Sequence, residues 1–143
     1  MGQQQLLLIV LGVIIVGIAV VVGINVFTAS SINANRDAVI SDLTTLAAMA
    51  QQYYRKPTAM GGGGNSFASF SIPSSLESTA NGSYSIKTAG TKTSIAFTGK
   101  GTEVLTAGGT DTVQVDMTVG PNSITGTSIV NWTIIKNNRI YIL

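Results

Sequence analysis

The chain has no cysteine and no histidine among its 143 residues. Their absence excludes disulfide bonds, thiolate nucleophiles, imidazole metal ligands and the most common general base of enzymes. Charged residues are also scarce, at 10% of the chain against about 25% in typical soluble domains. The eight basic side chains are scattered singly apart from Arg55-Lys56, so the sequence has no basic cluster typical of a nucleic-acid interface.

The few acidic residues give no indication of catalysis either. No two of them have a spacing typical of an acid/base pair, and no serine has a histidine partner to activate it. The run Gly61–Gly64 lacks the following Lys-Ser or Lys-Thr of a phosphate-binding loop and is interpreted as a flexible connector. We therefore expect no enzyme activity, no cofactor and no metal site. The acids, interpreted as exposed polar side chains, are Asp37, Asp42, Glu77, Glu103, Asp111 and Asp116.

One long apolar segment lies near the N-terminal end of the sequence. Leu6 to Ile24 contains 19 residues without one polar side chain, and the first charged residue is Arg36. A helix of that length spans roughly 28 Å, close to the roughly 30 Å hydrocarbon core of a bilayer. A helix in a soluble core would carry a polar stripe, which this segment lacks. A cleaved signal peptide is disfavoured, because the apolar run is too long and no Lys or Arg precedes it.

A second, amphipathic helical stretch follows without a strong helix breaker. Apolar side chains recur at helical spacing over residues 38–54, and Pro57 is the first proline of the chain. We predict one helix from about residue 3 to residue 55, roughly 80 Å long, with a weak point at Gly23 or around Ser30-Ser31, where helix propensity is low. The apolar stripe of its second half requires a partner. The stripe consists of Val39, Leu43, Leu46, Ala47, Ala50 and Tyr54.

Beyond Gly61 the apolar side chains alternate with polar ones, as they do in β-strands. The predicted strands are Ser83–Thr88, Lys92–Thr98, Thr112–Val119, Ser128–Lys136 and Arg139–Leu143. The predicted turns are Ala89-Gly90, Gly99-Lys100-Gly101, Gly108-Gly109 and Gly120-Pro121, and a tight hairpin is predicted at Asn137-Asn138. Strands joined by such short turns predict a mostly antiparallel sheet.

Together these elements predict an α+β fold, in which a long N-terminal hydrophobic helix carries a small antiparallel β-sheet head on its C-terminal half. The chain divides into a hydrophobic membrane-spanning or filament-core helix (1–27), an amphipathic continuation (28–56), a Gly/Ser-rich loop region (57–82) and the sheet head (83–143). We do not expect so small a head to fold well without the helix. The predicted helix-to-sheet contacts involve Val39, Leu43, Leu46, Ala50, Val113, Val115, Met117, Val130, Trp132 and Ile134.

The N-terminal segment resembles the start of mature type IV pilins and the related pseudopilins. In that family about four residues precede a glutamate, and a run of Leu, Val, Ile and Gly follows. Here Met1 to Gln5 precede the run Leu6–Val10 in the same register. The chain departs from the family pattern twice, because Gln5 replaces the glutamate and Val22-Gly23 stands where a helix-breaking proline is frequent. Gln5 can form hydrogen bonds but cannot neutralise a neighbouring ammonium group.

The resemblance implies a structural subunit that polymerises through its N-terminal helix into an extracellular, type IV pilus-like filament, of the bacterial or the archaeal kind. The implied partners are identical subunits, the membrane before assembly, and the pilus assembly machinery. The implied location is the cytoplasmic membrane before assembly and the cell surface afterwards. The implied helix–helix assembly core comprises Gln5, Leu6, Leu7, Leu8, Ile9, Val10, Leu11, Gly12, Val13, Ile14, Ile15, Val16, Gly17, Ile18, Val20, Val21, Val22, Gly23, Ile24 and Phe27.

Two alternative functions stay open at this level. The first is a pseudopilin of a secretion or uptake machine, which acts as a short-lived piston rather than a long fibre. The second is a single-pass membrane-anchored domain that binds a ligand or partner through its head. Asn81 and Asn131 match the N-glycosylation pattern, so both are candidate modification sites.

Overall fold

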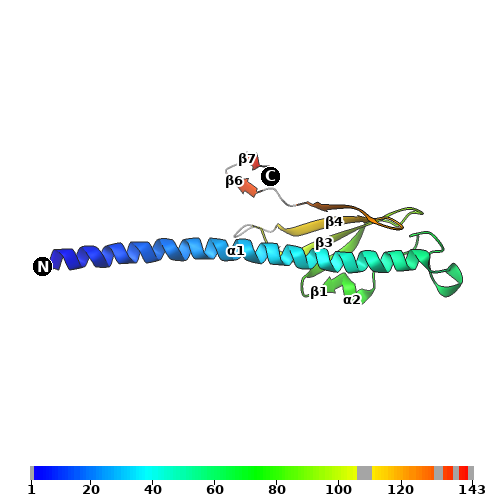
Figure 1. Cartoon of the computed structure of the whole chain (residues 1–143), viewed down its shortest axis with the longest axis horizontal. Coiled ribbons are helices and arrows are strands. Elements are labelled where there is room, and N and C mark those ends of the chain that lie inside the picture. The colour runs from blue at the N-terminus through cyan, green and yellow to red at the C-terminus, as the bar shows by residue number, and fades with distance from the viewer. Residues whose placement is uncertain (1, 106–110, 131–133, 137–138, 142–143) are drawn as a thin grey trace.

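The computed structural model describes residues 2–105, 111–130, 134–136 and 139–141. Its helices are α1 (Gly2–Arg55) and α2 (Ser74–Glu77), together with the short 3₁₀ helix η1 (Thr58–Met60). Its strands are β1 (Ser78–Thr79), β2 (Gly82–Thr88), β3 (Ile95–Val104), β4 (Thr112–Val119), β5 (Ile124–Ile129), β6 (Ile134–Lys136) and β7 (Arg139–Tyr141). A long helix carries a sheet beside its C-terminal half (Figure 1), which confirms the predicted α+β class.

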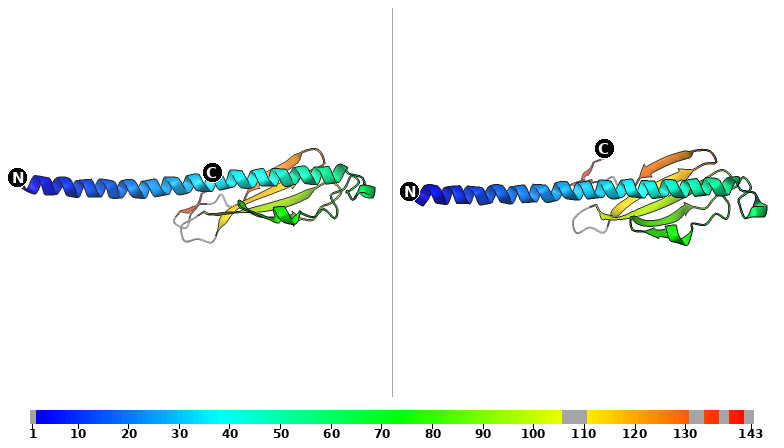
Figure 2. Two further views of the ribbon diagram at one scale, coloured as in Figure 1. Left: turned by 90° about the horizontal axis from the view of Figure 1, so that it is seen from below. Right: turned by 60° about the horizontal axis from the view of Figure 1, so that its bottom comes forward.

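Helix α1 runs for 54 residues without interruption, as the sequence predicted. Its first half extends beyond the sheet in every view (Figure 2). The helix continues through Gly23 and through Ser30-Ser31, where a weak point was predicted. The hydroxyl of Thr28 donates to the carbonyl oxygen of Ile24 at 3.0 Å, so this polar side chain is satisfied within the helix and does not compete with it.

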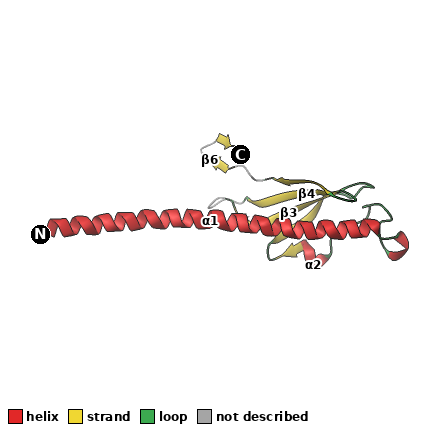
Figure 3. Ribbon diagram, in the orientation of Figure 1, coloured by secondary structure: helices red, strands yellow, loops and turns green. Residues whose placement is uncertain are grey.

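The head contains a five-stranded sheet with the strand order β1-β2-β3-β4-β5, in which every neighbouring pair is antiparallel. Helix α1 lies against the central strands β3 and β4 (Figure 3). The predicted apolar stripe faces this sheet, because Val39, Leu43, Leu46, Ala47 and Ala50 are all buried. The same core contains Phe67, Ile72, Tyr84, Ile95, Phe97, Val113, Val115, Met117 and Val119.

The predicted turn at Gly99-Lys100-Gly101 is wrong, because these residues lie within β3. Both glycines occur where the helix approaches the strand closely. A Cβ atom on Gly99 would lie 2.8 Å from Val39 Cγ1, and one on Gly101 would lie 2.0 Å from Asn35 Oδ1. These glycines therefore provide space for α1 and do not turn the chain.

The predicted strand Ser128–Lys136 is also wrong, because its residues belong to the separate strands β5 and β6. Strand β5 begins at Ile124 and was not predicted. All six of its residues are exposed or half-buried, so it carries no clear alternation of apolar and polar side chains. Strands β6 and β7 pair antiparallel with Lys136 opposite Arg139, and the predicted hairpin residues Asn137-Asn138 between them lie outside the described residues.

The predicted contact of Val130 with the helix is wrong. Val130 follows the end of β5 and is 44% exposed, and its backbone N–H donates to the carbonyl oxygen of Gln114 at 2.9 Å. Val130 therefore continues the edge of the sheet without entering the core. Trp132 and the side chain of Ile134, which were expected beside it, lie outside the described residues.

The glycine-rich run after α1 was predicted to be a flexible connector, but it is a tightly folded cap. The backbone N–H groups of Gly63 and Asn65 donate to the carbonyl oxygens of Tyr53 and Tyr54, both at 2.8 Å. These bonds satisfy carbonyl groups that the end of a helix leaves without partners. A Cβ atom on Gly63 would lie 1.8 Å from the carbonyl oxygen of Ser66, so this loop requires a residue without a side chain.

Candidate assembly surface

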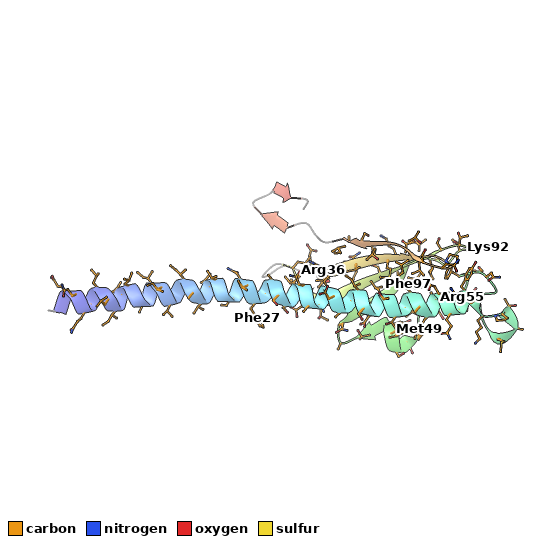
Figure 4. All side chains as sticks on the ribbon, in the orientation of Figure 1. Phe27, Arg36, Met49, Arg55, Lys92 and Phe97 are labelled. Atoms are coloured by element: carbon orange, nitrogen blue, oxygen red, sulfur yellow. The ribbon has the colours of Figure 1, made fainter. Side chains whose placement is uncertain are left out.

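The first half of α1 is an apolar surface with no cover of its own. We call residues 6–27 the shaft. Its large apolar side chains are between 49% exposed at Leu11 and 77% exposed at Phe27. They project from the helix on more than one side, and the labelled Phe27 lies on the part of α1 that extends beyond the sheet (Figure 4). Exposed apolar surface of this extent marks a site of contact with a membrane or with another protein.

The length and composition of this helix suit two environments. Helix α1 is long enough and apolar enough to cross a membrane, and no part of its most apolar 18-residue stretch is buried in the head. The other environment is a bundle of apolar helices. At Gly12, Gly17 and Gly23 nothing lies within 4 Å of the position that a Cβ atom would occupy, so their backbones are open to a close neighbour. Gln5 is exposed at the start of the same surface.

A polar clamp fixes α1 to the sheet at the boundary between shaft and head. The side-chain amide of Asn35 donates to the carbonyl oxygen of Asn81 at 2.9 Å. Further along α1, the carboxylate oxygen Oδ2 of Asp42 accepts hydrogen bonds from Tyr84 at 2.7 Å and from Thr79 and Asn81 at 3.0 Å. The head is therefore held on α1 by directed bonds as well as by apolar contact.

The clamp sets the protonation state of Asp42 and Tyr84. Burial disfavours the charged form of Asp42, but the hydrogen bonds from Tyr84, Asn81 and Thr79 outweigh it and hold the pKa of this carboxyl below its ordinary value of 3.8. Burial and the hydrogen bond to Asp42 raise the pKa of the Tyr84 phenol above its ordinary value of 10.0. Asp42 was interpreted as an exposed polar residue, so its structural role was missed.

A buried acid, Asp116, lies on the opposite face of the sheet. Asp116 is 7% exposed and accepts hydrogen bonds from Lys87 Nζ and Thr98 Oγ1, each at 2.5 Å. Burial opposes its charge, yet the bonds from Lys87 and Thr98 keep the pKa of Asp116 below its ordinary value of 3.8. A shallow depression of about 260 Å³ lies beside this pair. Within the described residues no group of three or more His, Cys, Asp or Glu side chains is placed to hold a metal ion.

Of the two predicted glycosylation sites, Asn81 lies within the described residues. The side-chain nitrogen of Asn81, to which a glycan would be joined, donates to Asp42 Oδ2 at 3.0 Å. A glycan at Asn81 would therefore compete with the clamp. Asn131 lies outside the described residues.

Comparisons with protein-family models, with curated proteins and with solved structures give no match. The resemblance to pilins therefore rests on the architecture. A long apolar N-terminal helix packs through its second half on an antiparallel sheet, and its first half stays free.

Proposed function

We propose that this protein is a structural subunit that polymerises through its shaft into an extracellular, type IV pilus-like filament. The observation that carries the proposal is the exposure of every large apolar side chain of the shaft beside a head that has its own hydrophobic core. A helix that is apolar on all sides is satisfied by lipid before assembly and by neighbouring copies of itself afterwards. Contacts between copies that are head-to-tail and do not close into a ring produce a helical filament.

The driving force for such an assembly is large. Removing the 19 residues of the segment Leu6–Ile24 from water, at roughly 1.5 kcal/mol for each large apolar side chain, favours the buried state by tens of kcal/mol before ordering costs are subtracted. Lipid satisfies the same side chains, so extraction from the membrane requires assembly machinery as a partner. The finished filament should then resist dissociation in water.

The test is a charge placed in the shaft. Ile14 is 53% exposed in the isolated chain, so Ile14→Lys disturbs no contact within the head. We expect this variant to lose its filaments in electron micrographs of material sheared from cells, because a lysine buried among apolar helices is costly. Ser85→Lys, on the exposed side of β2, is the matched control and should keep its filaments. Normal filaments from Ile14→Lys would contradict the proposal.

The length of α1 also favours a second candidate, a domain held by a single membrane span. The segment that would form a filament core is also long enough to cross a bilayer. In that case detergent extracts would contain monomers, and cells would carry no filaments. A pseudopilin would differ from a pilus subunit by forming only short polymers that are scarce on the cell exterior.

A further inference from the structure

The polar side chains next to the apolar segment occur in two groups, one at each end. Gln3, Gln4 and Gln5 precede the apolar residues 6–24, and all three are exposed. A polar band over residues 25–33 follows them. The band contains Asn25, Thr28, Ser30, Ser31 and Asn33.

Burial of the shaft among copies of itself, as the proposed function requires, creates a problem for the glutamines. Each side-chain amide offers two donors and one acceptor, and burying it against apolar side chains leaves them without partners. Within residues 3–33 a neighbouring copy offers polar partners at two heights, at its own glutamines and at its polar band. Copies that lie level would bring glutamines together, but level copies close into a bundle and do not extend a filament.

The alternative is that the glutamines of one copy lie beside the polar band of the next. The two copies are then offset by the distance between the two polar groups. From Gln4 to Ser30 there are 26 residues, which correspond to about 39 Å along a helix. At this offset the apolar residues 6–24 of one copy lie beside residues 32–50 of the other, on the side of α1 that faces away from the sheet. Ala34, Asp37, Ser41, Thr45 and Ala48 are exposed on that side, and Asp37 is the charged residue among them.

Two hydroxyl groups on this side of α1 already have hydrogen-bond partners within the helix. Thr44 and Thr45 donate to the carbonyl oxygens of Ile40 and Ser41, at 2.8 and 3.2 Å, within their own helix. Their hydroxyls therefore already have partners when water is removed. Ala34, Ser41 and Ala48 are also small, which permits close approach of a second helix.

We infer that contacting copies in the filament are offset by about 39 Å, so that the glutamines of one copy hydrogen-bond with the polar band of the next. The inference rests on the proposed function and specifies its register. In this inference the polar contacts of the glutamines fix the register between copies, because an apolar surface alone would permit many offsets.

Cysteine cross-linking tests this register directly, because the chain contains no cysteine of its own. Ser30→Cys is combined in turn with Gln3→Cys, Gln4→Cys and Gln5→Cys, whose side chains point in directions about 100° apart around the helix. Filaments of the full-length variants are imaged, oxidised and separated under denaturing, non-reducing conditions. The matched control combines Gln4→Cys with Val16→Cys, which lies about 18 Å along the helix from Gln4.

The expected result is a ladder of dimers, trimers and longer chains from at least one Gln/Ser30 pair, since every subunit then links to one copy above and one below. The Gln4/Val16 control should stay monomeric. A ladder from the control, dimers from Gln4→Cys alone, or intact filaments without a ladder from any Ser30 pair would overturn the offset and leave the filament in place. Absence of filaments from the unaltered chain would instead overturn the proposed function.

Discussion

Substitution of Gly99 tests how closely the head packs on α1. An alanine there would place its Cβ 2.8 Å from Val39 Cγ1 and 2.9 Å from Tyr84 Cε1. Val39 is 0% exposed and Tyr84 is 4% exposed, so neither side chain has free space to move into. Overpacking of this kind costs about 1–3 kcal/mol, although alanine recovers part of that cost because glycine loses more chain entropy on folding.

We expect Gly99→Ala to destabilise the head by about 1–2 kcal/mol, which corresponds to a decrease in Tm of about 5–10 °C for a domain of this size. Thermal unfolding of the full-length protein in detergent, followed by near-ultraviolet circular dichroism, measures the change. Gly126→Ala on β5 is the matched control, because a Cβ there has nothing within 4 Å. Equal Tm values for the two variants would refute the explanation of why β3 contains glycine.

Two further predictions concern Asp42 and Asp116. Asp42→Ala removes the acceptor shared by Tyr84, Thr79 and Asn81, so urea unfolding should show a free energy of unfolding lower by about 1–3 kcal/mol. The control Asp37→Ala, at an exposed position, should change the free energy of unfolding little. Equal decreases for the two variants would contradict the clamp. The pKa values of Asp42 and Asp116 are lowered in the folded protein. Their stabilising contribution is therefore complete well above the ordinary value of 3.8 and is lost as the pH falls through the lower folded values, so Tm should decrease as the pH is taken below 3.8. A Tm that stays constant in acid would contradict this assignment.

The elements that the sequence predicted best are those that bury one face. Helix α1 has a stripe of apolar residues at helical spacing, and β4 alternates cleanly because Val113, Val115, Met117 and Val119 all face the helix. In both cases burial imposes its period on the sequence. Strand β5 lies at the edge of the sheet with both faces largely exposed, so no such period marks it.

Two further errors concern glycine residues, because the structural role of a glycine depends on the residues packed around it. Gly99 and Gly101 were interpreted as turn residues, but their spacing of two places both on the side of β3 that meets α1. That spacing was a usable signal. Gly63 was interpreted as flexible, but its contacts with Tyr53 and Ser66 join residues whose proximity depends on the loop folding back.

The clamp could not be predicted from periodicity. Asp42 stands next to the buried stripe on α1, and its partners Thr79, Asn81 and Tyr84 come from β1, β2 and the turn between them. Only the register of the helix on the sheet brings these side chains together. The apolar surface of the shaft, in contrast, follows directly from composition, since Leu6–Ile24 contains no polar side chain.

The unbroken course of α1 couples the direction of the head to the direction of the shaft. Each residue inserted between them would rotate the sheet by about 100° around the long axis and raise it by about 1.5 Å. Seven inserted residues would restore the original orientation to within about 20°, with the sheet about 10 Å higher. If the head is to keep its orientation around the helix axis, the number of residues between the shaft and the head can therefore change only by whole helical repeats.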